Sequence, residues 1–243
     1  MTEEQNQNPL SGDPGAAAVA SPRRWWILVA LSLATTIIQF DQSGMTLALP
    51  HVQAELEATT QQLQWVMDAY SLALASVVLT AGAVSDRYGR RKVFLLGIVV
   101  LAVGSLIGAL APDANVVIAG RAVMGVGGAM FMPGTLSIIT HVFDRDTRPT
   151  AIGIWGAVTS LGVIVGPLIS GAVLQIWHWR GIFILNVVMA AIAFTGAAAL
   201  VPESRDPHPR RLDIPGALLA GVGLFGVSYA VIHSSSDGVT DTV

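Results

Sequence analysis

The sequence predicts an all-α integral membrane protein, and its composition and the length of its apolar runs are the observations that predict it. Of 243 residues, 53% are hydrophobic and only 12% are charged, whereas soluble domains carry roughly 25% charged residues. Several uninterrupted apolar runs reach the length of about 20 residues that a transmembrane helix needs. Lipid cannot satisfy open backbone groups, so these runs are expected to be helices.

The apolar runs divide the chain into a six-helix bundle and a seventh helix. They cover residues 23–49, 65–84, 93–111, 116–140, 150–175, 181–201 and 216–232, and short breaks with Pro, Gly or charged residues separate them. Residues 1–22 are polar and aperiodic, which predicts a flexible cytoplasmic tail. The expected divisions are therefore the tail at 1–22, the transmembrane bundle at 23–201, a cytoplasmic loop at 202–215, and the seventh helix with a short polar tail at 216–243.

The positions of Lys and Arg predict the orientation. Almost all of the 13 lysines and arginines fall in alternate breaks: Arg23, Arg24, Arg87, Arg90, Arg91, Lys92, Arg145, Arg148, Arg205, Arg210 and Arg211. Connecting segments that are rich in Lys and Arg face the cytoplasm. We therefore expect a multi-pass protein of the cell (inner) membrane with a cytoplasmic N-terminus. Tryptophans at the span ends predict interfacial belts: Trp25 and Trp26 on one side, and Trp65, Trp177 and Trp179 on the other.

Several classes of function are excluded or disfavoured. The net charge of −3 provides no basic surface for nucleic acid, and the absence of cysteine excludes thiolate metal sites. The five histidines lack the spacing of metal ligands. No nucleophile motif or paired loop carboxylates are present, so the chain is not expected to be an enzyme, and an intramembrane enzyme is the least favoured alternative.

Two charged residues lie where the bilayer should reject them. Asp41 follows Arg24 by about 17 residues, which places it roughly 25 Å along the first span, in the outer half. Arg121 enters the fourth span from the same side. A charge at mid-bilayer costs on the order of 3 kcal/mol, so such residues are paired or functional. We therefore expect Asp41 and Arg121 to face a shared interior, either as a functional site or as a structural ion pair.

Polar residues also follow a second face of the first span, and a third carboxylate lies in the second span. The stripe consists of Thr35, Gln39, Gln42 and Thr46, and at 100° per residue it centres well over 90° from Asp41. This helix is therefore expected to be screened from lipid on more than one side. Asp68 lies only a few residues inside its span, so interfacial solvation is expected to explain it.

The fifth span is rich in small residues. Gly162, Gly166 and Ser170 are spaced four apart, a pattern typical of close helix packing in membranes. Pro167 lacks an N–H and leaves the carbonyl of Val163 without its helical partner, which predicts a bend. The composition therefore indicates a close-packed, bending helix.

These segments resemble the major facilitator superfamily, and more narrowly its drug:proton antiporters with fourteen helices. Residues 82–92 (GAVSDRYGRRK) resemble the cytoplasmic loop motif G-x-L-A-D-R-x-G-R-K, and residues 121–129 (RAVMGVGGA) resemble the motif of a proton-coupling arginine. Residues 162–171 (GVIVGPLISG) resemble the antiporter motif G-x-x-x-G-P-x-x-G-G. Residues 40–50 and 179–186 resemble the first- and sixth-helix motifs of this branch. The departures are Val84, Ser85, Met124, Ser170 and Thr46.

The resemblance implies a role for each motif. Asp41 and Arg121 would couple transport to protons. The loop would latch the two halves of a transporter through Gly82, Asp86, Arg87, Gly89, Arg90 and Arg91. The antiporter helix, with Gly162, Gly166, Pro167 and Gly171, would lie where the halves move against each other. The proton gradient would drive small-molecule efflux without a cofactor.

The resemblance also implies an incomplete transporter. Such proteins have two six-helix halves, and this sequence supplies the N-terminal half and the first linking helix. We expect a truncated half whose partners are substrate, protons, the bilayer, and a missing C-terminal half or a second chain. The alternatives are a non-transporting membrane fragment, a half that needs a partner chain, and a proton symporter.

Overall fold

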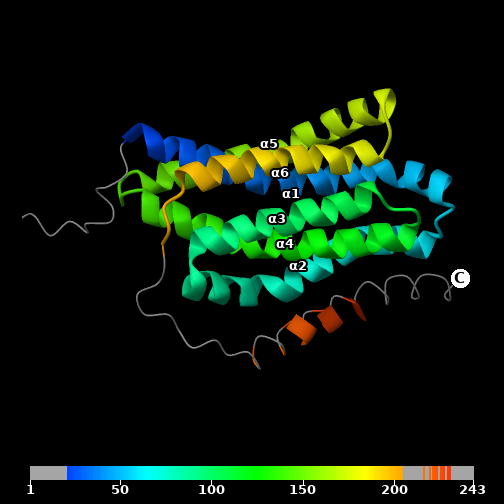
Figure 1. Cartoon of the computed structure of the whole chain (residues 1–243), viewed down its shortest axis with the longest axis horizontal. Coiled ribbons are helices and arrows are strands. Elements are labelled where there is room, and N and C mark those ends of the chain that lie inside the picture. The colour runs from blue at the N-terminus through cyan, green and yellow to red at the C-terminus, as the bar shows by residue number, and fades with distance from the viewer. Residues whose placement is uncertain are drawn as a thin grey trace, which may run out of the picture.

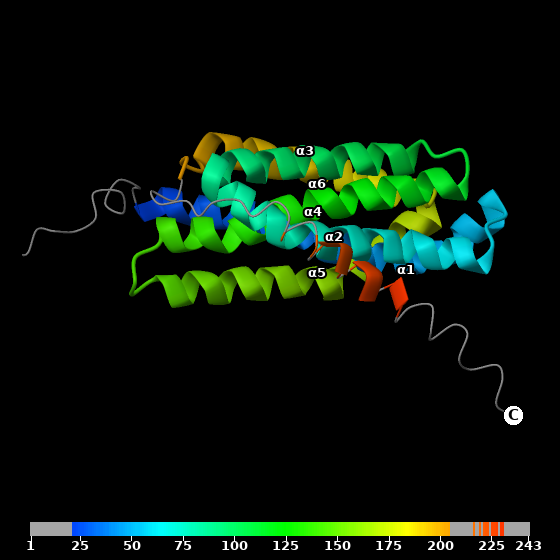
Figure 2. The same ribbon diagram turned by 90° about the horizontal axis from the view of Figure 1, so that it is seen from below.

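The computed structural model describes residues 21–204 and, beyond them, residues 216, 219, 221–223, 225–227 and 229–230. Its helices are α1 (Ser21–Leu56), α2 (Thr60–Tyr88), α3 (Arg90–Ala109), α4 (Ala114–Val142), α5 (Arg148–Ile176) and α6 (Arg180–Leu200). They run side by side along one axis (Figures 1 and 2). All six are long and apolar enough to cross a membrane. The predicted all-α membrane fold is confirmed.

The helix ends differ from the predicted spans most clearly in α1. This helix has 36 residues, so it is about 54 Å long, whereas the hydrocarbon core is about 30 Å thick. Hydropathy falls at Pro50, but the helix continues to Leu56 because the following turns remain amphipathic and bury Val52. At its other end, Ser21 and Pro22 belong to α1 and not to the expected tail.

The remaining divisions are only partly described. Residues 1–20 and 205–215 lie outside the described residues, so the expected tail and cytoplasmic loop stay predictions. Most of 216–243 is also outside them. The described positions from 216 to 230 are helical, and Tyr229 packs its ring 5.8 Å from that of Trp65 on α2.

Side-chain and backbone caps explain three of the helix ends. Thr59 and Gln62 form a capping box at the start of α2. Asp113 accepts hydrogen bonds from the amides of Asn115 (2.8 Å) and Val116 (3.1 Å) at the start of α4. Gly89 alone separates α2 from α3, and its φ of 116° lies in the region that favours glycine. The chain therefore reverses there within one residue.

The bundle consists of two packed groups of helices. One group contains α1 with α5 and α6, the other contains α4 with α2 and α3, and α3 also packs on α6. Glycines bring α3 and α4 into backbone contact, because a Cβ on Gly97 would lie 2.8 Å from the carbonyl oxygen of Gly127. On the other helix, a Cβ on Gly120 would lie 2.9 Å from the carbonyl oxygen of Gly104. Small residues allow this close approach in membranes.

Helix α5 lies at the edge of the bundle (Figure 2). Its buried residues form one narrow stripe: Ala151, Gly162, Gly166 and Ser170. The rest of its surface is apolar and open, with Ile164 65% and Leu168 70% exposed. Lipid or further helices are the surroundings that suit such a surface.

Candidate functional site

The structure brings the two charged residues of the spans into contact. Asp41 on α1 and Arg121 on α4 are both fully buried. The Nη1 of Arg121 donates to the Oδ2 of Asp41 as an ion pair. The expected shared interior therefore exists, and the two residues lie at the junction of the two helix groups.

Arg121 is held by α2 as well as by α1. Its Nε donates to the backbone carbonyl oxygen of Val66 at 2.9 Å, and its Nη2 donates to the Oε1 of Gln42 at 3.0 Å. The guanidinium also lies over the ring of Tyr70, 4.7 Å from the ring centroid, as a cation–π contact. Each guanidinium nitrogen thus has an acceptor, which offsets the loss of hydration.

The second oxygen of Asp41 is bound from α6. Asn186 is fully buried, and its Nδ2 donates to the Oδ1 of Asp41 at 2.7 Å. We call Asp41, Gln42, Tyr70, Arg121 and Asn186 the charge cluster. Its members come from α1, α2, α4 and α6, so the cluster links both groups of the bundle.

Asn186 and Tyr70 of this cluster were not predicted from the sequence, and Gln42 was predicted on another face. Gln42 was assigned to a stripe facing away from Asp41, but its long side chain reaches back to Arg121. Thr35, at the N-terminal end of the same stripe, faces α5 and not Asp41. Its Oγ1 accepts a hydrogen bond from the Nε1 of Trp155 on α5 (3.1 Å). Asn186 was detectable in principle, because a lone amide within an apolar span needs a buried partner.

The loop motif forms the sharp turn between α2 and α3. Asp86 and Arg90 are an ion pair at 2.9 Å within this turn. The Nη2 of Arg91 donates to the carbonyl oxygen of Ala198 at the end of α6 (2.5 Å), and its amide donates to Glu203 (3.3 Å). Arg87 lies over the ring of Tyr88 and is exposed. Two of the three motif arginines are thus engaged within the bundle.

The remaining loop glycine makes a looser contact. A Cβ on Gly82 would lie 3.7 Å from the Cβ of Pro133 on α4, which is an ordinary packing distance. Gly82 therefore has room for a small side chain, whereas Gly89 is fixed by its backbone conformation.

The glycines of the fifth helix pack against α1. A Cβ on Gly162 would lie 2.9 Å from the Cγ2 of Thr36, and one on Gly166 would lie 3.3 Å from the Cα of Phe40. Gly171, by contrast, has open space around it. The helix remains continuous across Pro167. Gly162 and Gly166 of this motif therefore allow α5 to pack closely against α1.

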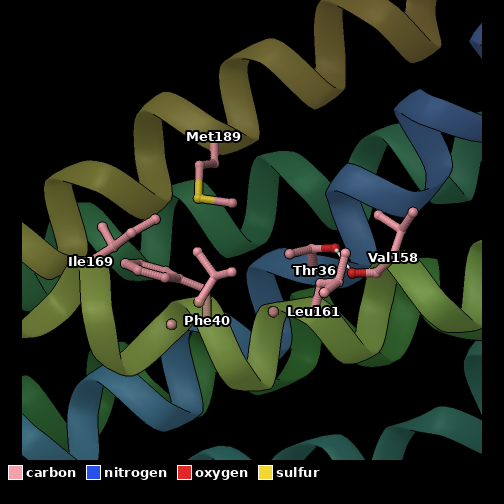
Figure 3. Close-up of a pocket in the computed structure, with 9 residues that line it drawn as sticks. Thr36, Phe40, Val158, Leu161, Ile169 and Met189 are labelled. Carbon is pink, nitrogen blue, oxygen red and sulfur yellow. Dashed lines mark hydrogen bonds between the residues drawn. The ribbon is translucent and has the colours of Figure 1, made fainter.

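An apolar cavity of about 230 Å³ lies between α1, α5 and α6. Figure 3 shows Phe40 and Thr36 of α1 facing Ile169, Leu161 and Val158 of α5, with Met189 of α6 above them. The Oγ1 of Thr36 donates to the carbonyl oxygen of Val158 at 3.5 Å. Among the residues that the structure describes, those that line this cavity carry no charge. It suits the hydrocarbon part of a small molecule or of a lipid.

A second polar group ties α1 to α6 at the opposite end from the loop motif. Glu55 forms an ion pair with Arg180, contacts the Nε2 of His178, and accepts a hydrogen bond from the Nε1 of Trp179 at 2.8 Å. Arg180 also donates to the carbonyl oxygen of Ala111 at 2.8 Å. Trp179 is only 2% exposed because it packs within the bundle, and its predicted place in an interfacial belt stays a prediction. Among the described residues, no three His, Asp or Glu side chains are grouped to hold a metal ion.

Sequence comparison relates most of the chain to a known family. The sequence profile of the Major Facilitator Superfamily matches residues 31–236. The chain is 34% identical to the multidrug efflux pump LfrA of Mycolicibacterium smegmatis over 233 residues, which cover 95% of this chain and 46% of that protein. It is 36% identical to the puromycin resistance protein pur8 of Streptomyces alboniger, over 97% of this chain and 47% of that protein.

Solved structures show the same fold at low sequence identity. A crystal structure of the peptide transporter POT in complex with sulfate superposes with a TM-score of 0.65 at 16% identity, covering 88% of this chain and 47% of that chain. A POT family transporter in complex with 5-aminolevulinic acid gives the same values. The chain spans about half the length of the relatives that it matches.

Proposed function

Because this chain belongs to the major facilitator superfamily, we propose that it is the N-terminal half of a proton-coupled efflux transporter for small hydrophobic or cationic compounds. Relatives at 34–36% identity whose names describe multidrug efflux and puromycin resistance support this class of cargo. The second half lies in the same protein or in a partner chain. The N-terminus and the basic breaks face the cytoplasm of the cell membrane.

The observation that carries the proposal is the fully buried ion pair of Asp41 and Arg121. A carboxylate that binds a proton loses its charge, and with it most of its attraction to the guanidinium. Because α1 and α4 belong to different helix groups, this change acts on the contact between the groups. Asp41 is the proton carrier, and Arg121 is the partner whose attraction to Asp41 depends on the charge of the carboxyl.

The other motifs support the movement that alternating access requires. The open apolar surface of α5 offers an area on which a second half can pack. At the loop motif, Arg87 and Lys92 are exposed and are therefore available to a second half or to anionic lipid. The proton gradient supplies the energy, so no cofactor is needed.

The direct test is a chimaera in which residues 1–243 are joined to the second half of the Mycolicibacterium smegmatis pump. Everted vesicles containing the chimaera are expected to show proton release when a cationic dye is added. The variant Asp41→Asn, which keeps the shape and loses the titrating group, is expected to reduce this release to background. Asp68→Asn is the matched control, because it removes a carboxylate of a span that is not a member of the charge cluster.

Two outcomes would contradict the proposal. Undiminished proton release by the Asp41→Asn chimaera would remove Asp41 from the coupling mechanism. Substrate-driven proton release by vesicles that contain residues 1–243 alone would show that no second half is required.

A further inference from the structure

We propose that Asn186 is a positioning residue that serves both protonation states of Asp41. Its amide nitrogen donates to the carboxylate, and after the amide turns over, its amide oxygen accepts a hydrogen bond from the O–H of the carboxylic acid. This inference deepens the proposed function and rests on its premise that Asp41 exchanges protons.

The first observation is the geometry of the contact. The Nδ2 of Asn186 lies 2.7 Å from the Oδ1 of Asp41, and both side chains are fully buried. The other carboxylate oxygen faces Arg121. Asn186 is therefore the hydrogen-bond partner of one specific oxygen, on the side of Asp41 that the guanidinium leaves free.

The second observation is an unpaired acceptor in the same amide. The Oδ1 of Asn186 is buried and has no hydrogen-bond partner. Buried polar atoms are rarely left unpaired, because each costs the desolvation of that atom. Rotation of the amide by half a turn exchanges its nitrogen and oxygen and brings the acceptor to Asp41.

The chemistry of protonation gives this acceptor its use. A protonated carboxyl carries an O–H that needs an acceptor, and Arg121 can only donate. Gln42 and the carbonyl of Val66 already accept from Arg121. The Tyr70 hydroxyl is unpaired too, but it lies against Gly128. The Ser170 hydroxyl is unpaired as well and lies against Gly44, so the amide oxygen of Asn186 is the unpaired acceptor within a group that already contacts the carboxyl.

The surroundings of Asp41 limit which groups can titrate with it. Its ionisable neighbours are Arg121 from α4 and, over the guanidinium, Tyr70 from α2. Asn186 from α6 and Gln42 from α1 carry no charge. Helix α5 places only the neutral Ser170 nearby, against Gly44. A change in proton affinity caused by substitution of Asn186 is therefore a change at Asp41.

The experiment measures protonation directly, without transport. Residues 1–243 are purified in lipid nanodiscs, and the infrared absorption of protonated carboxyl groups is recorded as the pH is varied. The signal that disappears in Asp41→Asn belongs to Asp41. Because no substrate or second half is needed, failure of the transport proposal and failure of this inference are distinguishable.

The expected result for Asn186→Leu has two parts. The carboxylate loses a charge-assisted hydrogen bond and the acid loses a weaker one, so the titration midpoint of Asp41 moves to higher pH by roughly one pH unit. The carboxyl band also moves to higher wavenumber, because the O–H no longer has an acceptor. A midpoint and a band equal to those of the unsubstituted chain would overturn the proposal.

Two further variants keep the test decisive. If Asn186→Leu does not fold, Asn186→Ala removes the amide without adding a titrating group, and the midpoint is expected to move in the same direction; an unchanged midpoint would again overturn the proposal. Thr135→Val is the control, because Thr135 is buried but donates only to Phe131 of its own helix. Its midpoint is expected to equal that of the unsubstituted chain.

Discussion

At the scale of single residues, the charge cluster balances desolvation against partners. Removing two charges from water costs several kcal/mol per ion, and the pair recovers this only with good geometry and further hydrogen bonds. Arg121 has three acceptors and an aromatic face, while Asp41 has donors on both oxygens. The pair is therefore tolerated in the bundle, and the larger energetic effect is expected when one partner is lost.

A double-mutant cycle tests this balance. Arg121→Met leaves Asp41 as an unpaired buried charge and is expected to destabilise the bundle by about 3–5 kcal/mol. The cycle is completed by Asp41→Leu alone and by the double variant, which removes both charges and is expected to be more stable than Arg121→Met alone. Unfolding measurements in detergent give the stability of all three variants. Additive effects of the two substitutions would show that the residues do not interact.

The ion pair at Glu55 is partly exposed, so its loss is expected to cost much less stability than the loss of one partner of the buried pair. Glu55 and His178 are 37% and 41% exposed at their side chains, so water screens their contacts. We expect Glu55→Gln to lower stability by no more than about 1 kcal/mol. Trp179→Ala, which empties a buried site beside Phe183, is expected to lower it by about 3–5 kcal/mol. The same thermal unfolding experiment compares the two, and a larger effect of Glu55→Gln would contradict this order.

At the scale of helices, glycine determines which pairs approach closely. Glycine weakens a helix by roughly 0.5–1 kcal/mol relative to alanine, so its concentration in α3, α4 and α5 requires a gain in packing. Gly97 and Gly104 supply it between α3 and α4, and Gly162 and Gly166 supply it between α5 and α1. Glycine thus lowers the intrinsic stability of these helices, and the closer backbone contact between them offsets that loss.

Two alanine substitutions in α5 should therefore have opposite effects. Gly162→Ala places a methyl group 2.9 Å from Thr36 and 3.1 Å from Gln39, so α5 must move and stability falls. Gly153→Ala, in the same helix, meets nothing within 4 Å and is expected to gain about 0.5–1 kcal/mol from helix propensity. The difference in unfolding temperature between the variants is the measurement. Equal shifts of the same sign would contradict the packing of α5 on α1.

Hydropathy was enough to predict the positions of the spans, but not the contacts that individual side chains make between helices. The six spans of the bundle were predicted because lipid demands long apolar runs. The end of α1 was misplaced because amphipathic turns beyond Pro50 have low hydropathy, although they bury Val52. Asp41 and Arg121 were paired by sign and depth alone. Tyr70 was missed because nothing local to it indicates which helix it faces. The lone amide of Asn186 indicates a buried partner, but not which residue that partner is.

At the scale of the whole molecule, the charges at the two ends predict a sidedness that can be measured. The chain contains no cysteine, so a single introduced cysteine is a unique label. We expect Asp146→Cys, between α4 and α5, to react with an impermeant maleimide only in everted vesicles. Glu57→Cys, between α1 and α2, is expected to react in intact cells. The reverse pattern would overturn the cytoplasmic assignment of the N-terminus.

Helices α1 and α6 are fastened to each other at two depths, by Asn186 to Asp41 and by the residues around Glu55. The first fastening depends on the charge state of a carboxyl, whereas the second lies near the helix ends, among partly hydrated groups. If Asp41 takes up a proton as proposed, only the inner fastening changes, from a hydrogen bond to a carboxylate into the weaker hydrogen bond to a carboxylic acid. We therefore expect the outer fastening to act as a pivot on that change, so that α1 tilts about its far end and does not slide along its neighbour.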